Sequence, residues 1–222
     1  MTGRTEELLR SAREAPLDSI ISVLRIPVTI AILLFSVIIH EVSHGVVAEK
    51  LGDPTARRQG RITLNPIPHI DLVGSIILPA IAVIMHLPLL GWAKPVPIDM
   101  RQFKDPMRDF AITAMAGPVS NLAQVMVYSL VFHVSLSFGW LFVATIASWG
   151  IYINLLLALF NLLPIPPLDG SRLIAAALPR DMGWQFLSIG RYGFMILMLL
   201  IFSGVLGPLW ALVGILHSAI VY

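Results

Sequence analysis

The chain has 222 residues, of which 57% are hydrophobic and 13% are charged, and its mean hydropathy is +0.84. Soluble domains carry about 25% charged residues, so this composition excludes an ordinary soluble protein and indicates an all-α polytopic protein embedded in a lipid bilayer. The net charge of +2, spread over short loops, argues against nucleic acid as a partner, and the absence of cysteine excludes disulfides and thiolate metal sites.

Residues 1–25 are predicted to form an amphipathic segment at the membrane surface, because their arginines and acidic side chains cancel in charge. Residues 26–222 are predicted to form a single membrane domain, since no polar stretch is long enough for a separate soluble domain. A cleaved signal peptide is the alternative for the first apolar run, but no cleavage site of the A-x-A type follows that run.

The first apolar run, residues 26–48, is predicted to be a helix with Pro27 in its first turn, and it contains a His-Glu-Val-Ser-His pentad. On a helix His40 and His44 lie one turn apart, so both imidazoles can face one metal ion, with Glu41 beside them to transfer a proton. A five-residue pattern with three fixed positions also arises by chance. Ionisable side chains within a lipid-buried helix are costly, however, and normally mark function.

Two proline-rich stretches flank the second apolar run, residues 72–93. The stretches 65–68 and 94–97 cannot lie inside helices, and we expect them to be extended and to form a small embedded β-loop. The run between them is interrupted by Pro79 and Pro88. We therefore expect it to be a re-entrant hairpin, with a full span as the alternative.

The remaining apolar runs are residues 110–168 and 192–222. About 20 apolar residues span a bilayer, so the first of these runs holds two helices, with a turn at Phe138-Gly139. Together with the pentad helix and the last run, these predict about four full transmembrane helices.

A catalytic zinc site uses three protein ligands and keeps one position open for water, so the pentad alone is incomplete. Asp169 is a good candidate for the third ligand, because it follows an apolar helix and the nearby prolines let its carboxylate approach at a steep angle. The other candidates are the loop carboxylates and the histidines outside the pentad: His69, His86, His133 and His217.

Two motifs together resemble the site-2 protease family of intramembrane metalloproteases. They are His40-Glu41-x-x-His44 and Asn161-x-x-Pro164-x-Pro166-Pro167-Leu168-Asp169-Gly170. Three further segments are similar to that family: Leu64-Asn65-Pro66, Gly91-Trp92-Ala93-Lys94-Pro95-Val96-Pro97 and Ala116-Gly117-Pro118-x-x-Asn121. The sequence has none of the PDZ-like or CBS-like insertions of larger members, so the resemblance implies a minimal form.

The resemblance implies one zinc ion per chain, with His40, His44 and Asp169 as ligands and Glu41 as general base. The place of Asn161 in the second motif implies that its amide orients the substrate carbonyl or stabilises the oxyanion. Helix-to-helix hydrogen bonding is the alternative role for this side chain.

Substrate contacts are predicted for Asn65, Pro66 and Lys94, because their proline-rich stretches offer unpaired backbone to an unwound substrate strand. For Lys94, snorkelling of the ammonium group to lipid headgroups is an equally good interpretation.

The expected topology follows from the ligands. For the three side chains to meet, the helices that lead to the pentad and to Asp169 must run in the same direction. The polar blocks 49–71, 94–109 and 169–191 then share one side of the membrane and carry 11 of the 15 Lys and Arg residues. The positive-inside rule predicts a multi-pass protein of the plasma membrane whose active site opens towards the cytoplasm.

The expected function is that of an intramembrane zinc endopeptidase whose partners are the lipid bilayer and transmembrane protein substrates. It would cut in or near transmembrane segments, in regulated intramembrane proteolysis or in the clearance of signal-peptide remnants. The alternatives are a membrane protein that binds or transports metal, and a non-catalytic paralogue that binds helices. Transport gives Glu41 no role, and no inverted repeat is visible. The sequence indicates no oligomeric state.

Overall fold

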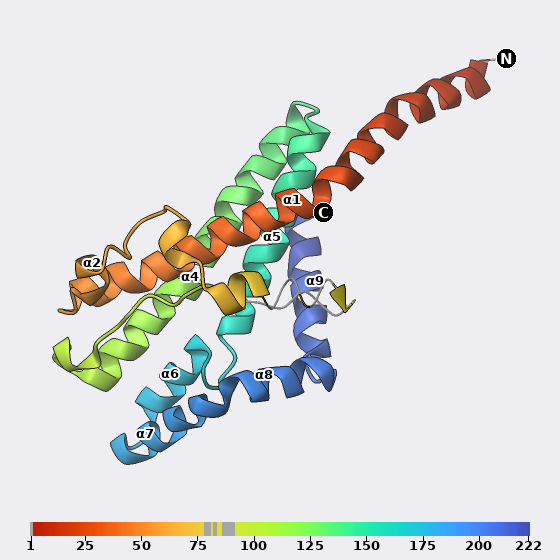
Figure 1. The fold of residues 1–222 in the computed structure, drawn as a ribbon. Helices are drawn as coiled ribbons and strands as arrows, with labels where there is room; N and C mark the ends of the chain where they lie inside the picture. The colour runs from red at the N-terminus through yellow and green to blue at the C-terminus, as the bar shows by residue number, and fades with distance from the viewer. Residues whose placement is uncertain (1, 78–80, 82–83, 86–91) are drawn as a thin grey trace.

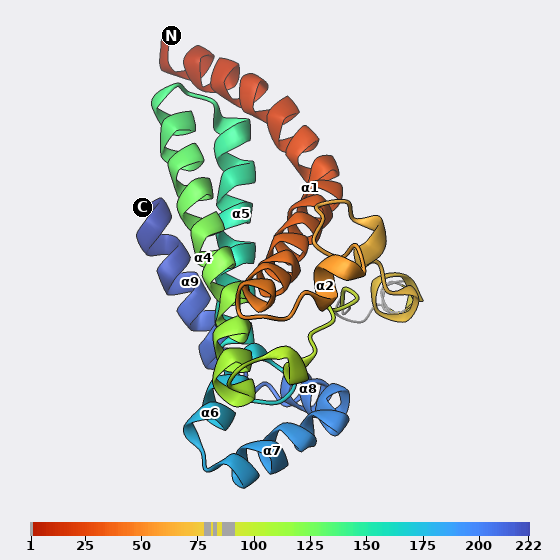
Figure 2. The same cartoon turned by 90° about the vertical axis from the view of Figure 1, so that its left-hand side faces the viewer.

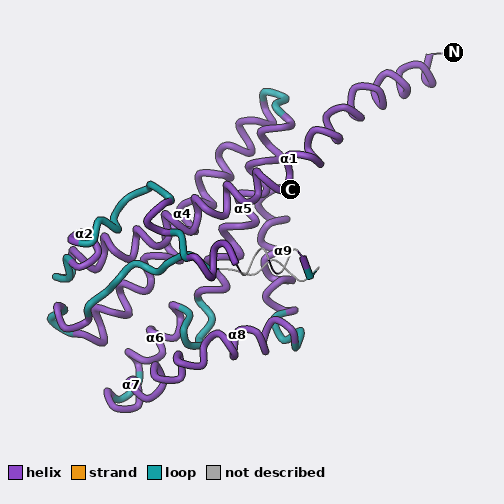
Figure 3. The backbone as a smooth tube through the Cα atoms, viewed as in Figure 1, coloured by secondary structure: helices purple, strands orange, loops and turns teal. Residues whose placement is uncertain are grey.

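The computed structural model describes residues 2–77, 81, 84–85 and 92–222, and this part of the chain consists of helices and loops with no strand (Figure 3). The α-helices are α1 (Thr2–Lys50), α2 (Thr55–Arg58), α4 (Pro106–Ser137), α5 (Leu141–Asn161), α6 (Asp169–Ala177), α7 (Arg180–Ser188), α8 (Gly193–Phe202) and α9 (Gly207–Val221). Short 3-10 helices cover Ile67–His69, Met100–Gln102 and Ile189–Tyr192, and a π-helix covers Leu72–Ile77.

Three helices of the described chain are long and apolar enough to cross a membrane: Val23–Lys50 of α1, Pro106–Ser137 and Leu141–Asn161. Many of their large apolar side chains are exposed, including Met126 at 68% and Leu130 at 67%. Apolar side chains left exposed on long helices are at their most stable in contact with lipid. The protein is therefore an all-helical membrane protein.

The amino-terminal segment and the pentad helix form one continuous helix, α1, whose first turns project beyond the other helices in Figure 1. The prediction that the helix begins with Pro27 in its first turn is wrong, because helical backbone extends upstream to Thr2. Proline removes one backbone hydrogen bond but does not by itself end a helix, and membrane helices tolerate it.

Helices α1 and α5 run in the same direction, and α4 runs against both (Figure 2). The α4–α5 turn is the predicted one, with Gly139 at φ +72°, a conformation that glycine adopts without strain. At its start, α4 has Pro106 in its first turn and the Asp105 carboxylate accepting a hydrogen bond from the Arg108 N–H. The shared direction of α1 and α5 agrees with the expectation drawn from the ligands.

The chain between α1 and α4 leaves and returns at the same end of the bundle, because the Asp53 carboxylate accepts a hydrogen bond of 2.7 Å from the Asp99 N–H. The expected β-loop is not present in this part of the described chain. Its first stretch contains the 3-10 helix Ile67–His69, and residues 94–97 form a loop without strand pairing. Alternating prolines remove the amides that a ladder needs. Half of the predicted re-entrant hairpin, residues 78–80, 82–83 and 86–91, lies outside the described residues.

The last apolar run is divided into α8 and α9, so it does not form the single straight span that its length suggests. The break follows Ser203, with Gly204 at φ +74°. A hydrophobic core joins α9 to the α4–α5 pair, and its buried members are Val125, Phe132, Ala144, Ala147, Ile151, Leu155 and Val213.

Candidate active site

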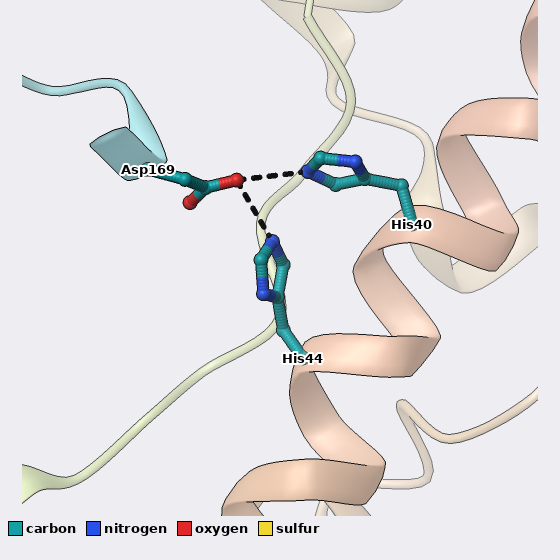
Figure 4. A group of neighbouring side chains, drawn as sticks. All are labelled: His40, His44 and Asp169. Carbon is teal, nitrogen blue, oxygen red and sulfur yellow. Dashed lines mark hydrogen bonds and ion pairs between the residues drawn. The ribbon is translucent and has the colours of Figure 1, made fainter. Parts of the chain in front are cut away.

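His40 and His44 of α1 and Asp169 of α6 meet in the interior of the protein (Figure 4). The Asp169 Oδ2 atom lies 3.1 Å from His40 Nε2 and 3.2 Å from His44 Nε2. All three residues are buried, with exposed fractions of 6%, 4% and 5%. The fold thus brings together the two pentad histidines and the carboxylate of the second motif.

A chain of buried hydrogen bonds fixes the orientation of the His40 ring. The Asn154 amide nitrogen donates to the Gly150 carbonyl, which can only accept, so the Asn154 oxygen receives the Asn121 amide N–H at 2.9 Å. The Asn121 oxygen therefore accepts from His40 Nδ1 at 2.6 Å. The Asn154 amide nitrogen also donates to the Ser36 hydroxyl at 2.9 Å, so this network links α1, α4 and α5.

The Nδ1 atom of His44 donates in the same way, to the backbone carbonyl of Thr113 at 2.7 Å. With both Nδ1 atoms protonated, the neutral imidazoles turn their Nε2 lone pairs towards the Asp169 carboxylate. Three lone-pair atoms at this separation repel one another unless a cation lies between them, and that cation is either protons on the rings or a metal ion.

The donor set fits zinc. Two imidazole nitrogens and one carboxylate oxygen are a ligand set of catalytic zinc sites, and bonds of about 2.0–2.1 Å in a tetrahedron place ligand atoms about 3.3 Å apart. The two distances of 3.1 and 3.2 Å to Asp169 Oδ2 are close to that value. The cluster can therefore hold a metal ion.

Asp169 follows the apolar helix, as expected, and opens a new one. Helix α5 ends at Asn161, a loop with three prolines follows, and Asp169 is the first residue of α6. The other carboxylate oxygen, Oδ1, accepts a hydrogen bond of 2.9 Å from Arg172. The Arg172 guanidinium lies 4.5 Å from the centre of the Phe110 ring, so a residue of α4 supports it.

The backbone of α4 lies directly against the two imidazoles at Gly117. A β-carbon at this position would lie 2.4 Å from His40 Nε2 and 2.5 Å from His44 Nε2. The close approach of α4 at this glycine is therefore to the candidate metal cluster itself.

Glu41 lies beside the cluster on α1 and is half-buried. Its Oε2 atom accepts a hydrogen bond of 2.8 Å from the backbone N–H of Val96. The loop at residues 94–97 thus contacts the residue predicted to act as general base.

The predicted substrate-binding residues occupy different settings. Lys94 is exposed, but its N–H donates to the His69 carbonyl at 2.9 Å, so the expectation of unpaired backbone donors at this residue is wrong. The exposed Asn65 uses its side-chain oxygen to accept from the Ile67 N–H, and Pro66 precedes the same 3-10 helix. These two residues stabilise their own turn.

Asn161, the predicted oxyanion residue, is half-buried at the end of α5, and its amide donates to the Leu157 carbonyl at 3.0 Å. His69, one of the other candidates for the third ligand, is buried with 1% exposure. It lies inside the loop because its Nε2 atom bonds the Thr63 carbonyl at 2.9 Å.

Sequence reasoning missed three side chains that support the cluster. They are Arg172, Asn121 and Asn154, none of which was predicted to act at the site. A signal existed for the asparagines, since amides are costly in apolar helices and require partners. For Arg172 the signal was its position one helical turn after Asp169.

The family model described as Peptidase family M50 matches residues 135–201, a segment that includes Asn161 and Asp169. The chain is 36% identical to "Putative zinc metalloprotease YwhC" of Bacillus subtilis (strain 168) over 181 residues, which cover 78% of this chain and 80% of that protein.

Two mycobacterial proteins are similar as well. Identity is 27% with "Putative zinc metalloprotease Rip2" of Mycolicibacterium smegmatis, over 77% of this chain and 64% of that protein. It is 32% with "Putative zinc metalloprotease Rip3" of Mycobacterium tuberculosis, over 68% of this chain and 31% of that protein. The match thus spans less than two thirds of both. No solved structure matches the chain.

Proposed function

This chain belongs to peptidase family M50, the site-2 protease family, and from that membership we propose that it is an intramembrane zinc endopeptidase. We propose that it hydrolyses peptide bonds in or near the transmembrane segments of other membrane proteins, in regulated intramembrane proteolysis or in the clearance of signal-peptide remnants. Its substrates would be helical proteins that reach the site through the bilayer.

One observation carries the proposal: three buried lone-pair atoms, from His40, His44 and Asp169, converge at metal-ligand separations. A zinc ion held by these side chains would supply Lewis-acid activation of water for attack on a peptide carbonyl. Asn121 and the Thr113 carbonyl support this role, because each fixes one imidazole with its Nε2 towards the centre.

Glu41 is the proposed general base. Its neighbouring position on α1 supports this, since the carboxylate can take the proton of the attacking water and give it to the leaving amine. Among the described residues its carboxylate accepts through Oε2, from the Val96 N–H, and Oε1 is the oxygen proposed to take the proton. A helical substrate has to unwind before this step, because its internal carbonyls are hydrogen-bonded.

We further propose that Asn161 stabilises the oxyanion. A side-chain amide carries two N–H donors, and the Leu157 carbonyl uses one of them. For Lys94 we propose a substrate contact through its exposed side chain, since its backbone N–H is bound to His69. For Asn65 and Pro66 we propose contacts at the surface of their turn.

For the membrane arrangement we propose four crossings, by α1, α4, α5 and the α8–α9 region, with residues 72–93 re-entering. The proposal is supported by the Asp53–Asp99 hydrogen bond, which brings both ends of the α1–α4 connection to one end of the bundle. The 11 basic residues of the three polar blocks favour the cytoplasmic side of the plasma membrane for that end, where the site would open.

The test compares purified wild-type protein with Glu41→Gln and Asp169→Ala, using zinc content and cleavage of a transmembrane model substrate. We expect one zinc per chain and cleavage in the wild type, zinc without cleavage in Glu41→Gln, and loss of both in Asp169→Ala. Glu49→Gln on the same helix, where Glu49 pairs with Arg57, and Asp181→Ala in the first turn of α7 are the matched controls. Cleavage that survives Glu41→Gln, or zinc without any cleavage in the wild type, would contradict the proposal.

A further inference from the structure

Arg61 is a buried cation whose described surroundings offer it no ion pair. Arg61 is 6% exposed. Within the residues that the structure describes, its guanidinium donates to two backbone carbonyls, those of Lys94 at 2.6 Å and Pro95 at 3.2 Å. Its Nε atom is buried without a hydrogen-bond partner among those residues. Burial of a guanidinium without a carboxylate is costly, so the contact with these carbonyls requires an explanation.

The carbonyls belong to a segment, residues 94–96, that cannot hold itself in place by strand pairing. Pro95 and Pro97 have no N–H, so the stretch Lys94-Pro95-Val96-Pro97 has only two amides. The Lys94 amide bonds the His69 carbonyl, and the Val96 amide bonds Glu41. The Arg61 Nη2 group donates to both of these successive carbonyls, and so anchors the segment where the prolines lack amides.

The same segment is packed against the pentad helix. Val96 is 6% exposed, and its Cγ1 would lie 3.1 Å from a β-carbon placed at Gly45, one residue after His44. The hydrogen bond from the Val96 N–H to Glu41 Oε2 measures 2.8 Å. Contacts therefore run from Arg61 through the segment to the carboxylate next to the candidate metal cluster.

We propose that Arg61 is a positioning residue for the reaction: it holds residues 94–96 so that the Val96 N–H keeps the Glu41 carboxylate turned towards the reacting water. This inference rests on the proposed function, in which Glu41 is the general base. A glutamate has several rotatable bonds, and a misplacement of about 1 Å at a reacting group can cost about hundredfold in rate.

The kinetic test uses Arg61→Met and Arg61→Lys, with Arg58→Met as the matched control because Arg58 is exposed three residues earlier. We expect Arg61→Met to keep one zinc per chain and an unchanged melting temperature while kcat falls by about tenfold to hundredfold. Arg61→Lys should recover part of kcat, since an ammonium also donates to carbonyls but without the planar fork. Arg58→Met should match the wild type.

A second readout does not depend on activity. Because Pro95 and Pro97 lack amides, residue-resolved hydrogen exchange over residues 94–97 reports on the Lys94 and Val96 amides alone. Arg61→Met should raise exchange there and leave α1 unchanged. Glu41→Ala should also raise exchange, because it removes the acceptor of the Val96 N–H.

An Arg61→Met protein with wild-type kcat, or with unchanged exchange at residues 94–97, would overturn the inference while leaving the proposed function in place. If Arg61→Met does not fold, Arg61→Lys decides by the same two measurements. If the wild type itself cleaves nothing, the proposed function fails, and the exchange data still decide whether Arg61 and Glu41 hold the segment.

Discussion

Asp169 divides its two carboxylate oxygens between two kinds of partner. Oδ2 faces the two imidazoles, whereas Oδ1 accepts the hydrogen bond from Arg172. A carboxylate held through one oxygen presents the other in a fixed direction, which reduces the conformational freedom that metal binding would otherwise remove. The guanidinium is itself held against Phe110.

We expect Arg172→Met to lower zinc affinity by about tenfold to hundredfold, the range typical for loss of a partner that orients a metal ligand. Competition with a chromophoric chelator measures the affinity directly. Arg180→Met is the control, because Arg180 is exposed at the start of α7. Equal affinity in the Arg172→Met and wild-type proteins would show that Asp169 needs no such support.

Sequence motifs predicted which side chains form the candidate metal cluster, but not which residues support them. His40, Glu41, His44 and Asp169 stand in short motifs whose spacing carries chemical meaning without a structure. Arg61 has no motif: its role depends on contacts with carbonyls 33 and 34 residues away. Contacts of this kind arise from the path of the loops, which local patterns do not specify.

At the scale of elements, the close approach of α4 to α1 depends on one glycine, Gly117, which has no side chain. With alanine at Gly117, the β-carbon would lie 2.4–2.5 Å from imidazole atoms of both histidines. Ordinary contacts are longer than this by about 1 Å, so either α4 or the rings have to move.

Gly117→Ala should therefore reduce cleavage by about hundredfold and weaken zinc binding, even though alanine favours a helix more than glycine does. Zinc content after dialysis and the rate of substrate cleavage are the measurements. Gly214→Ala in α9 is the control, since nothing lies within 4 Å of its added carbon. Wild-type zinc content and rate in Gly117→Ala would mean that the helices can separate without harm.

A helix end can be predicted where the backbone turns into a left-handed conformation, because glycine adopts that conformation without strain. Gly139, at φ +72°, follows the end of α4 at the predicted turn, and Gly52, at φ +113°, follows the end of α1. The break between α8 and α9 was missed, because the run from 192 to 222 is apolar throughout and hydropathy does not distinguish one long helix from two. The upstream extension of α1 was missed because proline is a common first-turn residue.

At the scale of the whole molecule, the absence of cysteine makes the membrane arrangement directly testable. Single cysteines at Arg58, Asp181 and Phe138 would each be the only thiol in the chain. We expect a membrane-impermeant maleimide to label Arg58→Cys and Asp181→Cys from the cytoplasmic side and Phe138→Cys, at the α4–α5 turn, from the other side.

Phe138 is 68% exposed and suits the reagent. Retained zinc content in each variant serves as the control for folding. Labelling of all three thiols from one side would contradict the crossing of the membrane by α4 and α5.

The distance along the chain between the parts of the site affects how the protein is made. The sequence separation of His40 and Asp169 is 129 residues, and synthesis proceeds at about 5–20 residues per second. Both pentad histidines are therefore translated roughly 6 to 26 seconds before the carboxylate that joins them. During that interval the nascent protein carries two of the three side chains of the cluster. The cluster can therefore form only after Asp169 has been translated. Until then the nascent chain cannot cleave neighbouring membrane proteins by the proposed mechanism.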